Sequence, residues 1–277
     1  MVCDTACDIS LEEAKKLNIE LIPLHIIYKD REYLDAFEIS PKEVYDRFEE
    51  EIPTTSLPSE FEMVEIFKSL KNKGYEKFIV ITISSGLSGT FNTAKSALLS
   101  TGFEHFCFDT KKIGIMSGVF AKFAATLRNE GYSFVEIRDL LIKNFHNSKG
   151  YYTLETLKYL IKGGRIGKVS GVLAGVLNIL PIISCNEDGI YYNVAKVRGK
   201  KNVYKKMAEL IKKDAIGDYE IYLCHGNNKD GLEEIKKYLY DEIRNAKDYR
   251  ENQITATLGV HTGESLVGAV VFSKNVR

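Results

Sequence analysis

The chain has 277 residues, of which 44% are hydrophobic and 27% are charged, and its 38 basic side chains balance 38 acidic ones. This composition excludes a disordered chain, and the length suits two domains slightly better than one. Because the net charge is zero, no overall field draws the chain to nucleic acid or to an anionic membrane. We therefore expect a small ligand and no nucleic-acid partner.

The cysteines and the apolar segments limit the remaining classes. Five cysteines stand at positions 3, 7, 107, 185 and 224, an odd number without CxxC spacing. This pattern predicts neither a disulfide framework nor a metal site, and it favours the cytoplasm. No secretory leader is visible, and the apolar stretch 172–183 is too short to span a bilayer. We expect no stable membrane insertion, and we interpret 172–183 as a buried helix followed by a strand.

The first half of the chain alternates helical and extended patterns. Ser10, Ser40 and Ser59 each precede a Glu by three residues, which is the signature of a helix start. Apolar runs at 21–28, 78–83 and 106–108 lie between these starts and have the length of buried strands. The alternation predicts an α/β domain over residues 1–148, with a mostly parallel sheet between two helical layers.

The polar, glycine-ended stretch 146–150 marks the expected domain boundary, and residues 149–277 read differently. A short helix from Leu154 ends at Gly163, and Asp188-Gly189 predicts a hairpin turn. Helices are expected near 203–213 and 232–245, with strands near 219–224 and 254–258. The second domain is therefore predicted to be a two-layer α+β unit with a mixed sheet.

The segment 77–94 carries the strongest functional signal. It reads as a strand, a tight turn and a helix start, and the turn supplies the hydroxyls of Ser84, Ser85 and Ser88. Hydroxyls beside the free N–H groups of a first helical turn suit a carboxylate or a phosphate. The alternative is an ordinary serine-rich turn with a helix cap. A nucleotide is disfavoured, because neither a Walker A nor a Rossmann pattern is present.

Two further segments supply candidate ligand-binding groups. Thr55 and Ser56 lie in an extended stretch between two prolines, where they can donate hydrogen bonds sideways or simply form a solvated linker. His261 lies near the end of the predicted strand 254–258, where it can contact a carboxylate or serve as a structural residue. The loops after parallel strands share one edge of the sheet, so we expect the hydroxyl groups to converge there.

The last candidate functional residues are two arginines and the serines that a Ser/His hydrolase would use. Arg165 and Arg198 lie in glycine-containing basic stretches that suit phosphate or an acidic partner, although such runs are often only solvated. A Ser/His hydrolase would use Ser85 or Ser88 with His261. The glycine required two residues after Ser88 is a threonine, so hydrogen-bond donation is favoured over nucleophilic attack.

Six short motifs occur in order along nearly the whole chain, and together they resemble the DegV family of bacterial fatty-acid-binding proteins. The motifs are Asp4-Thr-Ala-Cys-Asp8, Thr55-Ser-Leu-Pro-Ser59, Ser84-Ser-Gly-Leu-Ser-Gly-Thr90, Asp109-Thr-Lys111, the segment 156–167 and Gly259-Val-His-Thr-Gly263. The family has a few more residues before the first motif, so the first strand is expected to be short here.

The resemblance implies a two-domain protein that holds one long-chain fatty acid in an apolar tunnel and is not itself an enzyme. It also implies a partner, a dihydroxyacetone-kinase-like fatty acid kinase that converts the bound acid to an acyl phosphate for phospholipid synthesis, and no cofactor. The head group would be held by Thr55, Ser56, Ser84, Ser85, Ser88 and His261. Arg165 and Arg198 would face the kinase, while Phe120 and Phe123 suit either the tunnel or the core. A hydrolase and a phosphate- or sugar-binding module remain the alternatives.

Overall fold

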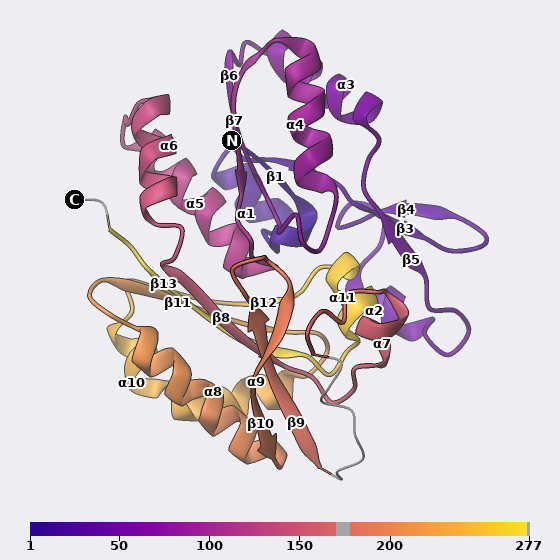
Figure 1. The fold of residues 1–277 in the computed structure, drawn as a ribbon, viewed down its shortest axis with the longest axis vertical. Helices are drawn as coiled ribbons and strands as arrows, with labels where there is room; N and C mark the ends of the chain where they lie inside the picture. The colour runs from indigo at the N-terminus through magenta and orange to yellow at the C-terminus, as the bar shows by residue number, and fades with distance from the viewer. Residues whose placement is uncertain (170–177, 276–277) are drawn as a thin grey trace.

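A computed structural model describes residues 1–169 and 178–275, and it contains three β-sheets (Figure 1). The first sheet is fully parallel and has the order β2-β1-β6-β7. Its strands are β1 (Val2–Asp4), β2 (Glu20–Ile22), β6 (Lys77–Thr82) and β7 (Glu104–Asp109).

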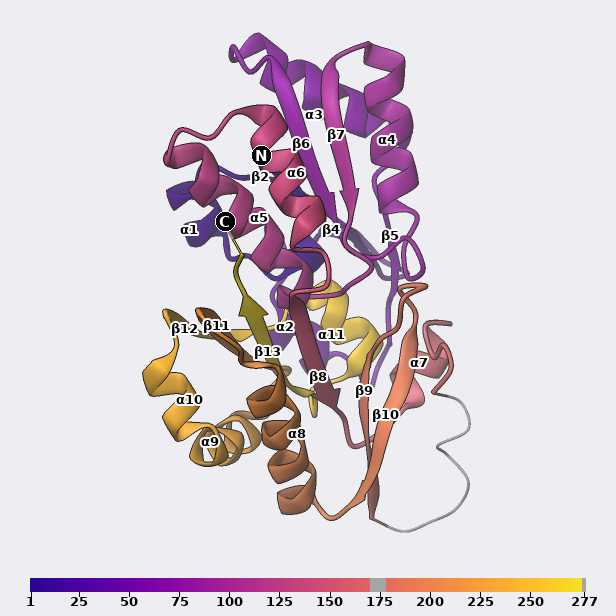
Figure 2. The same ribbon diagram turned by 60° about the vertical axis from the view of Figure 1, so that its left-hand side comes forward.

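Helices cover both faces of the parallel sheet. Helices α3 (Glu60–Asn72) and α4 (Thr90–Thr101) pack on one face, while α1 (Leu11–Lys16), α5 (Ile115–Asn129) and α6 (Phe134–Lys143) lie on the other (Figure 2). The short 3-10 helix η1 (Thr5–Cys7) follows β1 directly. The predicted three-layer α/β/α arrangement is confirmed.

The second sheet is mixed and has the order β10-β9-β8-β13-β11-β12, in which only β11 and β12 run parallel. Its strands are β8 (Ser148–Thr153), β9 (Ile179–Cys185), β10 (Tyr191–Arg198), β11 (Tyr219–His225), β12 (Asp248–Gln253) and β13 (Val267–Ser273). Helices α8 (Lys200–Asp214), α9 (Lys229–Tyr238) and α10 (Tyr240–Asn245) cover one face. The predicted α+β domain with a mixed sheet is confirmed, and the 148/149 boundary stays a prediction.

A small antiparallel sheet, β4-β3-β5, joins the two domains. It consists of β3 (His25–Ile27), β4 (Glu32–Leu34) and β5 (Thr54–Ser56), and it lies beside α2 (Pro41–Asp46) and α11 (Ala256–Thr262). The predicted single strand at 21–28 is wrong, because Pro23 and Leu24 separate β2 from β3 and place them in different sheets. Pro lacks the N–H that a continuous central strand would need.

Two predictions in the second domain also need correction. The expected helix 232–245 is divided at Leu239 into α9 and α10. The expected strand 254–258 is mostly helix: the strand β12 lies earlier, and α11 begins at Ala256 after the extended residue Thr255. β12 is a polar edge strand in which no residue is buried, so its sequence lacks the apolar pattern that would predict a strand. The predicted helix within 172–183 falls largely outside the described residues, and the strand β9 begins at Ile179.

Most helix starts follow the sequence signals. Ser40 and Ser59 each form a complete capping box with the Glu three residues later, and the side chain of Ser10 accepts a hydrogen bond from the backbone N–H of Glu13. These contacts satisfy N–H groups that the helix itself leaves unpaired. The cap positions therefore fix where the loops of the first domain end.

Helix α5 is buried because it packs between the parallel and the mixed sheets (Figure 1). Phe120 lies fully buried in the middle of α5. Its ring makes edge-to-face contacts with the rings of Phe108 on β7 and Phe272 on β13, with 5.3 Å and 5.5 Å between the ring centres. Phe123 packs on Phe272 as well. Both phenylalanines on α5 therefore belong to the core that joins the domains.

Replacing Phe120 with Ala should destabilise the whole protein, because the side chain contacts both sheets and leaves a cavity when removed. We expect a loss of about 3–5 kcal/mol in the free energy of unfolding, measured by urea denaturation. Phe61, which is 74% exposed, provides the control, and Phe61→Ala should change stability by no more than about 0.5 kcal/mol. Equal effects of the two substitutions would contradict this account of the core.

Candidate functional site: a cavity at the domain junction

A cavity with about 580 Å³ of empty space lies where the small sheet, the loops after β6 and β7, and α11 meet. Its polar lining residues are Thr55, Ser56, Ser88, Arg165, Thr257, His261 and Thr262. Its other lining residues are Leu24, Leu57, Ile83, Leu87, Ile113, Tyr191 and Leu258.

Thr55 and His261 meet at the polar part of the cavity. Thr55 lies on β5, and its Oγ1 is 2.8 Å from Nε2 of His261 on α11. The imidazole fits because Gly163 leaves room for it: a Cβ at that position would lie 2.1 Å from Nδ1 of His261. Two residues that are 206 positions apart in sequence thus form one polar pair.

Burial, followed by the positive charge of Arg165, lowers the pKa of His261 to about 4. The imidazole is therefore neutral at pH 7, and its Nδ1 has no hydrogen-bond partner in the structure. The guanidinium of Arg165 is held nearby by the carbonyl oxygens of Leu87, at 3.3 Å, and Gly163, at 2.5 Å. The polar end thus combines hydroxyls, a neutral imidazole and one cation.

The loop 83–89 between β6 and α4, which we call the hydroxyl loop, contributes only in part to the cavity wall. Ser88 lines the cavity, and its Oγ lies 2.8 Å from Oγ1 of Thr90 at the start of α4. Ser84 is fully buried and is not a lining residue of the cavity. Its Oγ accepts a hydrogen bond from the backbone N–H of Gly86. Neither Ser84 nor Ser85 is brought to the cavity surface, and their predicted role as head-group ligands stays a prediction.

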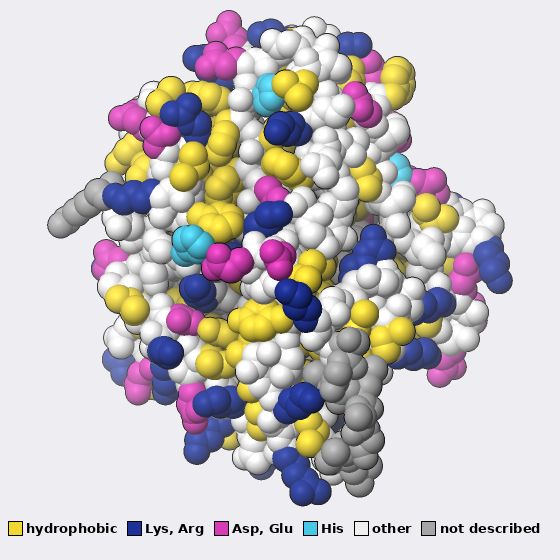
Figure 3. All heavy atoms as spheres, viewed as in Figure 1, with side chains coloured by type: hydrophobic (Ala, Val, Ile, Leu, Met, Phe, Trp, Pro, Cys, Tyr) yellow, Lys and Arg dark blue, Asp and Glu magenta, His cyan; other side chains and the backbone are white. Residues whose placement is uncertain are grey.

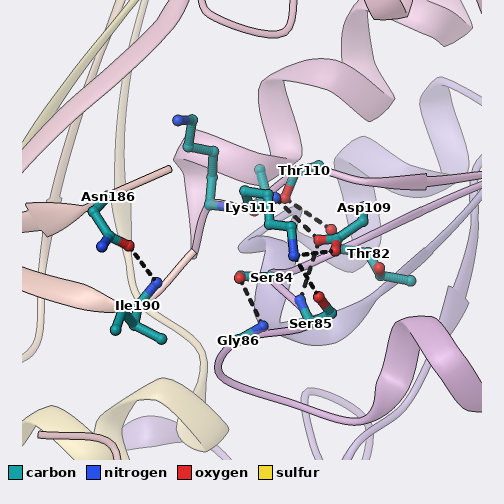
Figure 4. Close-up of polar contacts among 11 residues, drawn as sticks. Thr82, Ser84, Ser85, Gly86, Asp109, Thr110, Lys111, Asn186 and Ile190 are labelled. Atoms are coloured by element: carbon teal, nitrogen blue, oxygen red, sulfur yellow. Dashed lines mark hydrogen bonds and ion pairs between the residues drawn. The ribbon is translucent and has the colours of Figure 1, made fainter. Parts of the chain in front are cut away.

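Ser85 belongs instead to an ion-pair cluster shown in Figure 4. Nζ of Lys111 donates to Oγ of Ser85 at 2.7 Å and pairs with the carboxylate of Asp109 at 3.0 Å. The backbone N–H of Ser85 also donates to Asp109. Burial opposes the charge of Asp109, but the hydrogen bonds from Ser85 and Lys111 still hold its pKa below the usual value. This cluster fixes the loop between β6 and α4.

The tip of the β9–β10 hairpin packs closely against the loop between β6 and α4 (Figures 2 and 4). A Cβ on Gly86 would lie 2.7 Å from the carbonyl oxygen of Asp188, and a Cβ on Gly189 would lie 1.9 Å from Oγ of Ser84. Gly189 also has a positive φ of 76°. Glycine is thus required on both sides of this contact, which brings the second domain against the hydroxyl loop.

The remaining predicted residues lie apart from the polar pair. Arg198 is exposed at the end of β10 and is not a lining residue of the cavity. In the described residues, neither Ser85 nor Ser88 is hydrogen-bonded to His261, whose Nε2 contacts Thr55. The arrangement expected of a Ser/His hydrolase is therefore not assembled here.

A second, inner chamber adjoins the cavity and shares Ile113, Tyr191, Leu258 and Thr262 with it. The space between its lining atoms, including any part open to solvent, is about 320 Å³. The residues that line only this inner chamber are Asp8, Gly114, Tyr152, Ile183, Ile254 and Leu266. The two spaces together lead from the polar pair into a mostly apolar interior.

Sequence reasoning missed several of these residues. Thr257 and Thr262 line the cavity because α11 replaces the strand expected at 254–258. The extended N-cap Thr255 marks this helix start, and a Thr before an apolar run is a signal that could have revealed it. Ile113 and Leu258 line both chambers, but no local pattern distinguishes them from core residues.

The described residues also bear on metals, membranes and surface charge. They contain no group of three or more His, Cys, Asp or Glu side chains placed to hold a metal ion. None of their helices is both long and apolar enough to cross a membrane. Figure 3 shows acidic and basic side chains interspersed over one face of the molecule, without a large patch of one sign.

Fold and site together define a two-domain α/β protein with a polar-ended apolar cavity at the domain junction. A family model described as an uncharacterised protein of the DegV family matches residues 1–274, and the chain belongs to the DegV family. A DegV domain-containing protein of Clostridium acetobutylicum is 41% identical over 99% of this chain and 98% of its own length.

Solved structures show the same fold. The chain is similar to DegV from Bacillus subtilis, described as a fatty acid binding protein, with a TM-score of 0.89, 26% identity and coverage of 99% of this chain and 98% of that one. It is also similar to a Thermotoga maritima protein whose structure is described as revealing a fatty acid binding function, with a TM-score of 0.82, 25% identity and coverage of 98% and 97%.

Lowering the pH should remove the contribution of the neutral His261 side chain to stability. Its folded pKa of about 4 lies below the ordinary 6.5, so between these values the unfolded state binds more protons than the native state. The contribution of His261 to stability should therefore fall as the pH drops through this window. We expect the wild type to lose about 3 kcal/mol more than His261→Gln between pH 6.5 and pH 4, measured by urea unfolding.

His146 is exposed and serves as the control, so His146→Gln should follow the wild-type pH dependence. The titration of the His261 ring, followed by NMR, gives an independent reading. A midpoint near the ordinary value of 6.5 would contradict the described environment of this imidazole.

Proposed function

We propose that the chain binds one long-chain fatty acid, with the carboxylate at Thr55 and His261 and the acyl tail in the two adjoining chambers. The observation that carries this proposal is the pairing of a hydroxyl–imidazole cluster with an apolar interior at the domain junction. The relatives from B. subtilis and T. maritima, which are described as binding fatty acids, support it.

The head group would be held mainly by uncharged donors. Thr55, Ser56 and Ser88 line the polar part of the cavity and can donate to a carboxylate, while Arg165 supplies one positive charge beside them. Ser84 and Ser85, whose hydrogen bonds hold the loop that carries Ser88, stay predicted head-group ligands. Each hydrogen bond to a charged acceptor contributes about 1.5–3 kcal/mol, and each buried CH₂ contributes about 0.8 kcal/mol. The tail should therefore dominate affinity.

We further propose that the chain performs no chemistry alone and presents its fatty acid, in the cytoplasm, to a dihydroxyacetone-kinase-like fatty acid kinase. Hydrogen bonds from neutral groups leave a carboxylate oxygen free to attack the terminal phosphate of ATP in the partner, where an acyl phosphate forms as ADP leaves. Arg165 at the cavity and the exposed Arg198 on β10 are the proposed kinase-facing cations. The acyl phosphate would enter phospholipid synthesis.

The two alternatives have less support. A hydrolase needs a base beside its nucleophile, and the His261 imidazole contacts Thr55 instead of a serine. A phosphate- or sugar-binding module does not account for the mostly apolar inner chamber. Turnover of acyl esters that is lost in His261→Ala would favour the hydrolase over the carrier.

Thr55→Val should weaken fatty-acid binding about tenfold or more, because it removes a hydroxyl donor while keeping the shape of the side chain. The adjacent Thr54→Val is the matched control, since Thr54 lies on the same strand but is exposed and is not a lining residue. The measurement is displacement of a fluorescent fatty acid by palmitate from delipidated protein. Equal affinities for both variants would remove Thr55 from the site.

Arg198→Ala should leave fatty-acid affinity unchanged but reduce acyl phosphate formation about tenfold, because loss of one interfacial cation costs on the order of 1–2 kcal/mol. The assay combines the loaded protein, ATP, Mg²⁺ and the partner kinase. Lys213→Ala, an exposed cation on α8, is the control and should retain full activity. A normal rate for Arg198→Ala would place the kinase elsewhere.

A further inference from the structure

The inner chamber contains one carboxyl group among mostly apolar neighbours. Asp8 lines this chamber together with Ile183, Ile254 and Leu266, and it does not line the outer cavity that contains Thr55 and His261. Its side chain is nearly completely buried. A carboxyl group in such surroundings is costly unless it has a structural or functional role.

The position of Asp8 is fixed by both backbone and side chain. Asp8 follows η1 with a positive φ of 56°, a conformation that few residues other than Gly, Asn and Asp adopt readily. Its Oδ1 accepts a hydrogen bond of 2.8 Å from the backbone N–H of Thr255, just before α11. Asp8 therefore ties the first strand region to the segment that carries His261.

The second carboxyl oxygen of Asp8 has no hydrogen-bond partner and lies close to Gly114. Oδ2 of Asp8 has no hydrogen bond in the structure, and a Cβ on Gly114 would lie 2.8 Å from it. Gly114 also lines the inner chamber. This unpaired oxygen thus belongs to a residue that lines the space proposed for the acyl tail.

A separate groove lies on the other side of Asp8. It has about 880 Å³ of empty space and is lined by charged residues, among them Glu13, Lys122 and Arg250. Nζ of Lys122 pairs with Glu13 at 2.6 Å and lies 4.4 Å from the ring centre of Tyr222. Among the described residues, only Asp8 lines both this charged groove and the inner chamber.

We propose that Asp8 is the end wall of the acyl chamber and sets the longest fatty acid that the protein accepts, an inference that rests on the proposed fatty-acid binding. A tail that reaches Asp8 has filled the apolar space. A longer tail must displace the carboxyl group or enter the charged groove, where its burial brings no gain. Asp8 is therefore a specificity-determining residue for chain length.

The protonation state of Asp8 fits this position. Burial raises its pKa to about 8, although the hydrogen bond from Thr255 opposes this effect. The carboxyl group is thus largely neutral at pH 7. A neutral carboxyl group is a far less costly neighbour for a terminal methyl group than a carboxylate would be.

The test measures the affinities of delipidated protein for saturated acids from lauric to lignoceric. For the wild type, affinity should rise about fourfold per added methylene until the tail meets Asp8, and then level off or fall. Asp8→Ala opens the wall and should move this break to a longer acid, improving the relative affinity for the next longer acids about tenfold. Asp8→Asn keeps the size of the side chain and an acceptor for Thr255, so it should retain the wild-type break.

Asp8→Glu provides a second variant that keeps the acceptor, in case Asp8→Ala does not fold. Its longer side chain should move the break to a shorter acid. An unchanged break in folded Asp8→Ala or Asp8→Glu, or a wild-type affinity that rises steadily through lignoceric acid, would overturn the role of Asp8. Absence of binding for every acid by the wild type would instead refute the proposed function.

Discussion

The packing of α5 between two sheets is the constraint on which the rest of the structure depends. A helix that contacts one sheet needs one apolar face, but α5 is buried along nearly its whole length because it contacts both. Phe120 connects β7 to β13 through two edge-to-face contacts. Since both domains contribute lining residues to the cavity, the packing of α5 between the two sheets also sets how these residues are placed relative to one another.

The site follows from that junction. Thr55 comes from the small sheet, His261 from α11 and Ser88 from the loop after β6, so no single segment forms the polar end. Glycines permit the close contacts: Gly163 makes room for the imidazole, while Gly86 and Gly189 allow the hairpin to reach the loop. The result is a polar end of mainly neutral donors that leads into a mostly apolar chamber. Such an arrangement suits a ligand with one anionic end and a long tail.

Much of this architecture could be predicted from the sequence, because local signals are strong where one segment decides the outcome. Ser40 and Ser59 start helices through their own capping boxes, and Asp188-Gly189 forms its hairpin turn. The predictions failed where tertiary contacts decide. The edge strand β12 is too polar to be predicted, and the short apolar run before and within α11 predicts a strand as readily as a helix because it fits both periods. Whether Ser84 faces the cavity depends on the hairpin from the other domain, which no local pattern reveals.

The most direct test of the account is native mass spectrometry of the protein purified without added ligand, followed by identification of what organic solvent extracts. The account predicts one fatty acid per chain, and a protein stripped of lipid should take up one equivalent of added palmitate or oleate. A protein that carries a phosphorylated metabolite, or that binds neither acid after stripping, would contradict the central claim that the junction cavity is an acyl-chain site.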